Sequence, residues 1–273
     1  MSKKVRLDQL IVDRGLIESR EKAKRTIMAG LVFSDGQRLD KAGTKVDDDI
    51  PIEIKGKAIP YVGRGGLKLE KAIYFFNLDL TGQVMVDVGS STGGFTDCGL
   101  QNGVKQSYAI DVGYNQLDWK LRNDPRVVVM ERTNFRYVTP DNLIGEVPNF
   151  ASVDVSFISL KLILPPLYEL LEKGSKAVIL IKPQFEAGRE QVGKKGIVRD
   201  PAVHLQVLQD IITFAKETGF QLLDLTFSPI TGGDGNIEYL ALLGKDEKER
   251  EEVVDYLTLT EKVVDESHQT LDR

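Results

Sequence analysis

The feature that most constrains the fold is an alternation of patterns that begins near residue 84. Seven apolar runs of strand length follow one another, and helical patterns over 93–102, 159–172 and 201–218 lie between several of them. Strands that alternate with helices form βαβ units, which build a parallel sheet covered by helices. The last two runs are joined by a loop alone and predict one antiparallel hairpin at the end of the sheet. We therefore predict an α/β fold with a doubly wound, mostly parallel, seven-stranded Rossmann-like sheet. The seven runs are VMVDVG, SYAIDV, RVVVM, FASVDVSF, KAVILIKP, LLDLTFS and IEYLALLG, and a charged helical tail is predicted over 245–273.

The residues before this alternation predict a separate, small α+β domain. Leu7, Leu10 and Ile11 share one face of a helix, and Ser19 can cap a second helix that Gly30 ends. Short apolar pieces after it, separated by a Ser-Asp-Gly turn, predict a small sheet. The glycine-containing stretch "KGKAIPYVGRGG" is typical of a linker. We predict two domains, at residues 1–62 and 63–273.

The composition argues against metal and membrane functions. The chain has one cysteine, Cys98, and two histidines, His204 and His268, which are too few for a zinc cluster, so no metal is expected. No apolar run approaches the roughly 20 residues of a membrane span, and the first residues lack the apolar core of a signal peptide. We expect a cytoplasmic protein without a membrane or an obligatory protein partner. The net charge of −5 argues weakly against nucleic acid, but the basic excess is concentrated in the first 62 residues.

A glycine-rich turn, "VDVGSSTGGFTD" at 86–97, follows the first strand of the alternation. No lysine follows Gly94, as a Walker loop would require, and the spacing from Gly89 to Gly93 departs from the dinucleotide fingerprint. S-adenosylmethionine carries a cationic sulfonium and no phosphate, so it tolerates the carboxylate of Asp87. Asp111, at the end of the next strand, can bind the ribose hydroxyls, although a loop-capping role is equally open.

Together these patterns are typical of a class I methyltransferase. Thr133 and Asn134, after the third strand, are candidates for the adenine edge, with an ordinary turn role as the alternative. We therefore predict S-adenosylmethionine as the cofactor. The predicted cofactor-binding residues are Asp87, Gly89, Ser90, Ser91, Thr92, Gly93, Gly94, Phe95, Asp111, Asn134 and Asp154.

Residues at the other strand ends favour a hydroxyl as the methyl acceptor. Cytosine C5 chemistry needs a nucleophilic cysteine, and Cys98 lies inside a predicted helix, where a core role is expected. Methylation of exocyclic amines usually comes with two prolines that "DVSF" at 154–157 lacks. A hydroxyl must lose its proton, and a lysine can take it once burial or a cationic neighbour lowers its pKa from about 10.4 toward neutrality.

Lys182 ends an apolar run, where a solvent-seeking lysine is unusual. Asp154 ends the preceding strand and Glu238 begins the last one. Ligands bind outside the carboxyl ends of the strands in this fold, which is where Asp154 and Lys182 fall. Strand-end charges that face water are the alternative for each residue taken alone.

Longer stretches of the sequence resemble known families. "RLDQLIVDRGLIESREKAKRTIMAGLVFSDGQRL" resembles the alpha-L RNA-binding domain named after ribosomal protein S4, whose basic second helix meets RNA phosphates. "GRGGLKLEKA" and "DVGSSTGGFTD" resemble the TlyA (haemolysin A) family, which has an FtsJ-like methyltransferase domain and is assigned to ribose methylation of ribosomal RNA. The resemblance spans essentially the whole chain.

The resemblance implies an S-adenosylmethionine-dependent rRNA ribose 2′-O-methyltransferase that acts on cytidine in the large subunit, the small subunit or both. Ribosomal RNA or ribosomal subunits would be its partners. Lys68, Asp154, Lys182 and Glu238 look like the catalytic tetrad of FtsJ-like enzymes. The resemblance implies that Lys182 is the base, that Lys68 and Glu238 help to set its pKa and position the acceptor, and that Asp154 lies near the sulfonium.

Basic residues in both domains are candidates for RNA contacts. In the predicted second helix of the first domain, the basic residues recur at helical spacing. The alternative interpretation is a charged face that contacts only solvent. "EAGREQVGKKGIVRDP" at 186–201 follows Lys182 and predicts a lid that closes on the RNA backbone, or a flexible surface loop. The predicted RNA-binding residues are Arg6, Arg20, Lys22, Lys24, Arg25, Arg64, Arg189, Lys194 and Lys195.

The residues support two other functions less well. A non-catalytic ribosome-binding factor would keep the fold, but the intact tetrad and glycine turn argue against it. A membrane-lysing protein, as the name haemolysin suggests, needs membrane-inserting segments that the sequence does not show.

Overall fold

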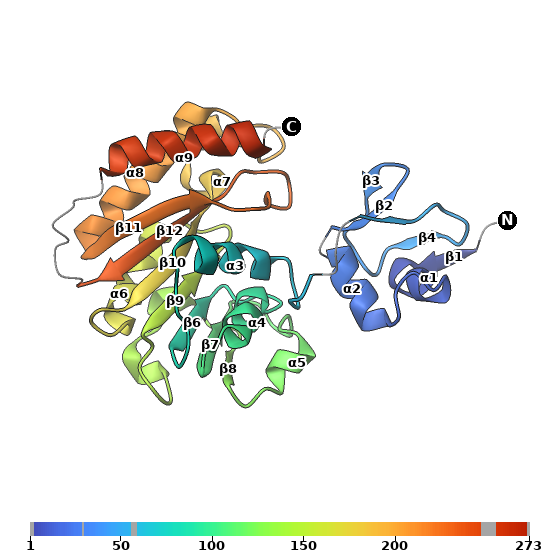
Figure 1. Ribbon diagram of the computed structural model, residues 1–273, viewed down its shortest axis with the longest axis horizontal. Helices are drawn as coiled ribbons and strands as arrows, with labels where there is room; N and C mark the ends of the chain where they lie inside the picture. Colours follow the sequence, from blue (N-terminus) through green and yellow to red (C-terminus); the bar gives the residue numbers. More distant parts are fainter. Residues whose placement is uncertain (1–2, 29, 56–58, 247–254, 272–273) are drawn as a thin grey trace. The chain divides into compact units, whose positions relative to one another are not determined.

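The computed structural model describes residues 3–28, 30–55, 59–246 and 255–271. Its contacts divide the chain into two compact units, Met1–Gly65 and Gly66–Arg273, each with an apolar core of its own (Figure 1).

The first unit packs two helices against two small antiparallel sheets. The predicted helix face is confirmed, since Leu7, Leu10 and Ile11 are buried in the core. Ser19 caps the second helix by accepting a hydrogen bond from the backbone N–H of Lys22 at 3.3 Å. The sheet order is β3-β2-β5 in one sheet and β1-β4 in the other. The elements are β1 (Lys4–Arg6), α1 (Leu7–Asp13), α2 (Arg20–Met28), β2 (Val32–Ser34), β3 (Gln37–Arg38), β4 (Lys45–Asp47) and β5 (Glu53–Ile54).

The second unit is built on one sheet of seven strands in the order β11-β12-β10-β9-β6-β7-β8. Each of the seven apolar runs forms one of these strands, so the predicted α/β sheet is confirmed. Neighbouring strands from β10 to β8 are parallel, and β12 runs antiparallel to its neighbours β10 and β11. The strands are β6 (Val84–Val88), β7 (Gln106–Ile110), β8 (Val127–Met130), β9 (Phe150–Val153), β10 (Lys176–Ile181), β11 (Phe220–Phe227) and β12 (Tyr239–Lys245).

The antiparallel insertion of β12 brings distant residues to one edge of the sheet. The predicted hairpin of the last two strands is confirmed, and its second strand enters the sheet between β11 and β10. Tyr239, the first residue of β12, pairs with Ile181, the last residue of β10. The residues just outside this pair, Glu238 and Lys182, are therefore neighbours at the carboxyl edge of the parallel strands.

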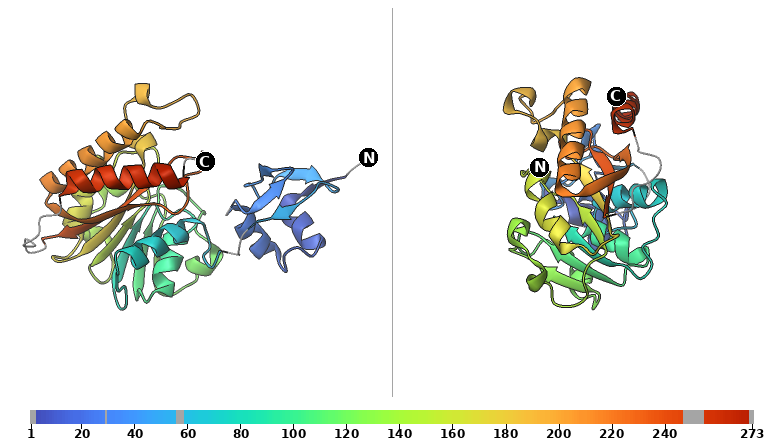
Figure 2. Two further views of the ribbon diagram at one scale, coloured as in Figure 1. Left: turned by 45° about the horizontal axis from the view of Figure 1, so that its top comes forward. Right: turned by 90° about the vertical axis from the view of Figure 1, so that its left-hand side faces the viewer.

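Helices cover both faces of the sheet, as expected of a doubly wound fold (Figures 1 and 2). The alternate residues Val84, Val86 and Val88 pack into the cluster formed with α6 and α8, whereas Met85 lies against Gly99 of α4. The helices are α3 (Gly65–Phe75), α4 (Gly94–Gln101), α5 (Trp119–Arg122), α6 (Leu164–Leu170), α7 (Pro183–Glu186), α8 (Pro201–Thr218) and α9 (Tyr256–Leu271), with short 3₁₀ turns η1 (Phe135–Tyr137), η2 (Pro140–Asn142), η3 (Leu160–Leu162) and η4 (Arg189–Gln191).

Two of the predicted helices differ from the structure. The pattern over 159–172 forms η3 and α6 instead of one helix, because Pro165 and Pro166 lack the N–H groups of a helix interior and fit only its first turn. The predicted tail forms α9, and its part over 247–254 lies outside the described residues. No helix in the described ranges combines the length and the apolar character needed to cross a bilayer.

Candidate active site

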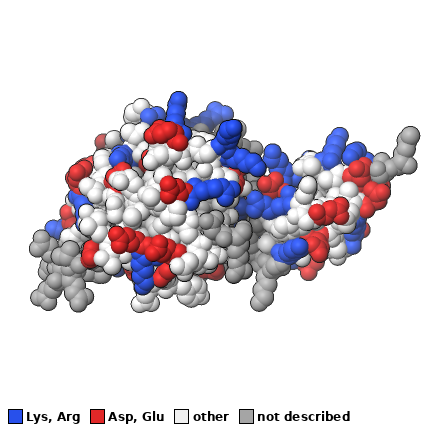
Figure 3. All heavy atoms as spheres, turned by 90° about the horizontal axis from the view of Figure 1, so that it is seen from above, with Lys and Arg blue, Asp and Glu red and all other residues white. Residues whose placement is uncertain are grey.

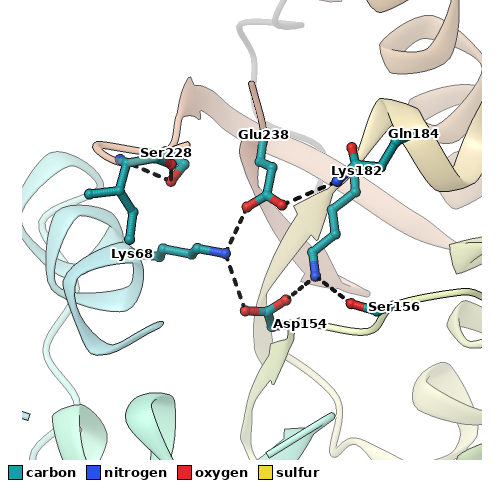
Figure 4. A network of polar contacts seen from close by, with 8 residues as sticks. Lys68, Asp154, Ser156, Lys182, Gln184, Ser228 and Glu238 are labelled. Atoms are coloured by element: carbon teal, nitrogen blue, oxygen red, sulfur yellow. Dashed lines mark hydrogen bonds and ion pairs between the residues drawn. The ribbon is translucent and has the colours of Figure 1, made fainter. Parts of the chain in front are cut away.

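Four charged side chains from distant parts of the chain meet at the carboxyl edge of the sheet (Figure 4). Lys68 comes from α3, Asp154 follows β9, Lys182 follows β10 and Glu238 precedes β12. The Nζ of Lys68 lies 2.7 Å from Oε2 of Glu238 and 3.5 Å from Oδ2 of Asp154. The Nζ of Lys182 lies 2.5 Å from Oδ1 of Asp154. The structure thus assembles the tetrad that the family resemblance implied.

The signs of the charges alternate along this cluster, which makes its burial tolerable. Lys68, Lys182 and Glu238 are buried, and the side chain of Asp154 is 18% exposed. Burial by itself raises the pKa of Asp154, but the ammonium groups of Lys68 and Lys182 outweigh it and lower that pKa overall. Buried charges need such partners, because an unpaired ion away from water is costly. Two cations and two anions therefore form one connected unit.

Two polar side chains extend the cluster at its ends, and sequence reasoning did not identify either. Ser156 Oγ accepts a hydrogen bond from Lys182 Nζ at 3.1 Å. Gln184 Nε2 donates to Glu238 Oε1 at 3.4 Å. Each lies two residues from a tetrad member, and this proximity was the only signal in the sequence.

Next to the cluster, the glycine turn after β6 approaches the end of β9 very closely. Gly89 has φ of +84°, and a Cβ there would lie 2.4 Å from the backbone oxygen of Asp154. Gly93, at the start of α4, has φ of +95° and a Cβ would lie 2.2 Å from Leu121. Both positions require glycine, because backbone or packed side chains occupy the space that a side chain would need.

A pocket of about 320 Å³ opens between the glycine turn and the ends of β7, β8 and β9. This volume is within the usual range for small-molecule sites. Five predicted cofactor residues line it, namely Gly89, Ser91, Asp111, Asn134 and Asp154. Residues that sequence reasoning did not select also line the pocket, and they include Gln116, Phe135, Val155, Ser156, Phe157, Ile158 and Ile163.

The carboxylate of Asp111 is held in a fixed position at the pocket wall. Its Oδ2 accepts from the backbone N–H of Ser91 at 2.8 Å, and its Oδ1 accepts from the backbone N–H of Gly113 at 2.7 Å. Each oxygen can still accept a further hydrogen bond. The loop-capping role and the ribose-binding role that the sequence left open are therefore compatible. Asn134 likewise lines the pocket while its Oδ1 accepts from the backbone N–H of Arg136 and caps η1.

The charge of the pocket fits a cationic nucleoside better than a phosphate. Asp111 and Asp154 are its charged residues, and the described residues that line it include no Lys, Arg or His. A phosphate-bearing ligand would face the carboxylate of Asp111 with no cation in the lining, because the lysines that pair with Asp154 lie outside it. An adenosyl group attached to a sulfonium instead finds apolar walls and a fixed carboxylate for its ribose, and Asp154 lies where the pocket meets the lysines. The residues present therefore fit S-adenosylmethionine.

The other predicted cofactor residues do not line this pocket. Asp87 is fully buried behind the glycine turn, where it accepts hydrogen bonds from the N–H and Oγ1 of Thr96 and from Oγ of Ser152. Asp87 thus ties α4 to β6 and β9. Burial raises its pKa to about 6, against the hydrogen bonds from Thr96 and Ser152 that lower it. Ser90, Thr92, Gly93, Gly94 and Phe95 are likewise outside the pocket lining and shape the turn itself.

Asp87→Asn is expected to gain stability relative to the wild type as the pH rises from about 4 to about 7. The folded protein binds the Asp87 proton more tightly than the unfolded chain, because the pKa is about 6 in the fold and about 3.9 in a free chain. Removing that proton therefore destabilises the wild type alone, by about 2 kcal/mol over this interval. Urea unfolding of both proteins at several pH values measures the difference, and a constant difference would contradict it.

The predicted RNA-binding residues of the first unit are largely engaged within it. Arg6 and Arg20 both pair with the fully buried carboxylate of Asp8, at 2.9 Å and 3.0 Å, and leave about half of their own side chains exposed. On the face that Figure 3 shows, basic and acidic side chains are interspersed. Lys22 pairs with Glu18, Arg25 lies 3.8 Å from Glu21, and Lys24 is half-buried on α2. Arg64 lies in the turn that precedes α3.

The basic stretch after Lys182 is exposed but anchored at its base. Arg189, Lys194 and Lys195 are exposed. Asn236 is buried beneath the stretch, where its Oδ1 accepts from the backbone N–H of Val198 at 3.0 Å and its Nδ2 donates to the carbonyl of Gly196 at 2.9 Å. The cations therefore project from a loop that is hydrogen-bonded to Asn236, which lies two residues before Glu238 in the sequence.

Comparison with known proteins identifies two known types of domain in the chain. A family model described as FtsJ-like methyltransferase matches residues 61–245, and an S4 domain model matches residues 5–49. YqxC of Bacillus subtilis is 60% identical over 99% of this chain and 96% of that protein. The Mycobacterium tuberculosis protein named 16S/23S rRNA (cytidine-2′-O)-methyltransferase TlyA is 41% identical over 89% of this chain and 91% of its own length.

A solved structure from Streptococcus thermophilus is also similar over the whole chain. It is 51% identical, superimposes with a TM-score of 0.79, and the match covers 100% of this chain and 98% of that one. Both units of the fold thus recur together in a related protein.

Proposed function

Because this chain belongs to the FtsJ-like methyltransferase family and carries an S4 domain ahead of its catalytic domain, we propose that it methylates ribose 2′-hydroxyls of ribosomal RNA with S-adenosylmethionine. The observation that carries the proposal is the Lys68–Asp154–Lys182–Glu238 cluster at the edge of a pocket lined by carboxylates. In this proposal residues 1–62 form the RNA-binding domain and residues 63–273 the methyltransferase domain.

The charge and shape of the pocket support this choice of cofactor. Asp111 would accept hydrogen bonds from the ribose hydroxyls, and the apolar walls near Phe135 and Ile163 would enclose the adenine. S-adenosylmethionine, when bound, supplies the methyl group on a positively charged sulfur. Asp154 would lie nearest to that charge, because its carboxylate joins the pocket to the lysines.

Lys182 is the proposed general base. Its Nζ is held between the carboxylate of Asp154 and the hydroxyl of Ser156. As the neutral amine, this Nζ would take the proton of the 2′-hydroxyl while the oxygen bonds to the methyl carbon and the neutral sulfide of the cofactor leaves. Lys68 bridges Asp154 and Glu238 and so keeps both carboxylates in place around the acceptor.

The acceptor is proposed as cytidine in ribosomal RNA, in the large subunit, the small subunit or both. The support is the activity that the M. tuberculosis relative is named for, since the two sequences align over most of both chains. An RNA-binding S4 domain in front of the catalytic domain agrees with a large RNA substrate. Since ribosomes are the substrate in this proposal, we place the protein in the cytoplasm.

Mapping of 2′-O-methyl groups by mass spectrometry tests the proposal. The purified protein is incubated with S-adenosylmethionine and with unmodified large or small ribosomal subunits, and nuclease fragments are compared with those of untreated subunits. A new 2′-O-methylcytidine in either rRNA is the expected result. Methyl groups on bases alone, or no methyl transfer to either subunit, would contradict it.

The two alternative functions predict different results in simple assays. A non-catalytic ribosome factor predicts no binding of S-adenosylmethionine by calorimetry, whereas the acid-lined pocket predicts binding. A membrane-lysing protein predicts dye release from liposomes, whereas no membrane-spanning helix is found among the described helices. The assembled tetrad favours methyl transfer over both.

Reversing the charge of the basic loop is expected to weaken RNA binding without changing the cofactor site. In Lys194→Glu/Lys195→Glu two exposed cations of the loop become anions. If both bind phosphates, the affinity for rRNA falls and the slope of log affinity against log salt decreases by about 1 for each phosphate that is no longer bound. Filter binding over a salt series measures this.

The matched control is Lys173→Glu/Lys176→Glu, which reverses the same number of charges just before and at the start of β10, at the opposite edge of the sheet. We expect it to leave the salt slope unchanged. Equal effects of the loop variant and the control would show that the loop makes no specific RNA contact.

A further inference from the structure

The loop that follows Asp154 forms one wall of the cofactor pocket and has an unusual conformation. Val155, Ser156, Phe157 and Ile158 all line the pocket. Phe157 has φ of +61° and is 91% exposed. A bulky residue in the left-handed region is strained, and such strain persists only where surrounding contacts impose it. Neighbouring segments must therefore hold this loop in place.

The segment that begins with Lys182 and continues through α7 supplies such contacts. Ser156 Oγ accepts from Lys182 Nζ at 3.1 Å, and the rings of Phe157 and Phe185 lie 4.9 Å apart. Beyond Phe157, the carboxylate of Glu186 accepts hydrogen bonds from residues 159 and 160. One short segment of the chain therefore contacts the loop along its length.

Glu186 makes the firmest of these contacts. Its Oε2 accepts from Ser159 Oγ at 2.6 Å, and its Oε1 accepts from the backbone N–H of Leu160 at 2.8 Å. Ser159 Oγ in turn accepts from the backbone N–H of Lys161 and caps η3. The carboxylate is half-buried, and burial raises its pKa despite these hydrogen bonds. A half-buried carboxylate with two short hydrogen bonds is a rigid joint between α7 and the loop.

Glu186 does not line the pocket and is separate from the charged cluster. Its effect on the site must therefore pass through the loop. Because the chain from Leu160 back to Ser156 is only a few residues long, a shift at Leu160 moves the pocket wall and the Ser156 hydroxyl that Lys182 contacts. Small displacements of this kind can cost a large factor in rate.

We propose that Glu186 is a positioning residue for methyl transfer, which fixes the 155–159 loop against α7 so that the pocket wall and Ser156 stay in register with Lys182. This inference rests on the proposed function, in which Lys182 is the base. It assigns a role to Glu186, an acid that lies four residues after Lys182 and is not part of the charged cluster.

Glu186→Ala and Glu186→Gln test the proposal together. The alanine variant loses both acceptors, and we expect S-adenosylmethionine to bind about tenfold more weakly and kcat to fall about 10-fold to 100-fold. Glutamine can still accept from Leu160 with its carbonyl and donate to Ser159 Oγ with its amide, so it should restore most of both values. Calorimetry gives the binding constant, and methyl incorporation into ribosomal subunits gives kcat and KM.

Asp255→Ala provides a matched control for lost stability. Asp255 also accepts from a hydroxyl and a backbone N–H, of Thr258 at 2.6 Å and Leu257 at 3.2 Å, but at the start of α9. It should lower the melting temperature without changing binding or kcat. If Glu186→Ala does not fold, Ser159→Ala removes one of the two hydrogen bonds and should give a smaller loss of the same kind.

The outcomes separate the two proposals. Wild-type protein that neither binds S-adenosylmethionine nor transfers methyl groups overturns the proposed function. Active wild type with Glu186→Ala, or Ser159→Ala in its place, showing unchanged binding and kcat overturns the positioning role alone. A loss that glutamine does not restore, or that Asp255→Ala reproduces, also overturns it.

Discussion

Lys182→Ala is expected to reduce methyl transfer by about 10²-fold to 10⁴-fold while S-adenosylmethionine still binds. The variant removes the Nζ that lies 2.5 Å from Asp154, and general-base catalysis contributes an effect of this size. Binding should survive, because Asp111 and the glycine turn are untouched and Asp154 keeps Lys68 as a partner at 3.5 Å. Methyl incorporation at saturating substrate and calorimetry with the cofactor measure the two effects separately.

Lys176→Ala serves as the control for this variant. Lys176 begins β10, at the opposite end of the strand from Lys182, and is not part of the charged cluster. It should leave both binding and rate close to the wild type. An unchanged rate in Lys182→Ala would remove Lys182 from the mechanism, and a loss of cofactor binding equal to the loss of rate would make it a binding residue instead of a base.

Gly89→Ala is expected to destabilise the protein by about 2 to 5 kcal/mol and to abolish cofactor binding at ordinary concentrations. Left-handed backbone costs a non-glycine residue roughly 1–2 kcal/mol, and overpacking typically costs about 1–3 kcal/mol more. The added Cβ would lie 2.4 Å from the backbone oxygen and 2.9 Å from the backbone carbon of Asp154. Because β6 and β9 are paired in the sheet, neither backbone can withdraw without moving the pocket.

Gly82→Ala separates the clash from the backbone strain. Gly82 has φ of +72°, close to that of Gly89, but an added Cβ would meet nothing within 4 Å. It should cost only about 1–2 kcal/mol and leave binding of S-adenosylmethionine unchanged. Urea unfolding and calorimetry on both variants give the comparison. If the two variants behave alike, close approach to Asp154 is not the reason for glycine at position 89.

Much of the catalytic domain was predictable because its signals are local. Each strand is a run of apolar residues, and the glycine turn and the acids that follow strands lie a few residues from the elements that place them. Parallel strands bring their carboxyl ends to one edge, so Asp111, Asp154 and Lys182 could be placed near one another before their contacts were known. The split helix over 159–172 was a missed local signal, since Pro165 and Pro166 already limited where it could begin.

The sequence by itself therefore determined the α/β class, the seven strands, the glycine turn and the types of residue at the strand ends. Only the tertiary structure decided that β12 enters beside β10 and brings Glu238 to Lys182, that Asp87 supports the turn from behind the pocket, and that Glu186 joins α7 to the 155–159 loop. The physical reason is that strand order, burial and hydrogen-bond partners depend on residues tens of positions apart. Local patterns show which chemical groups are present, whereas packing sets which of them meet.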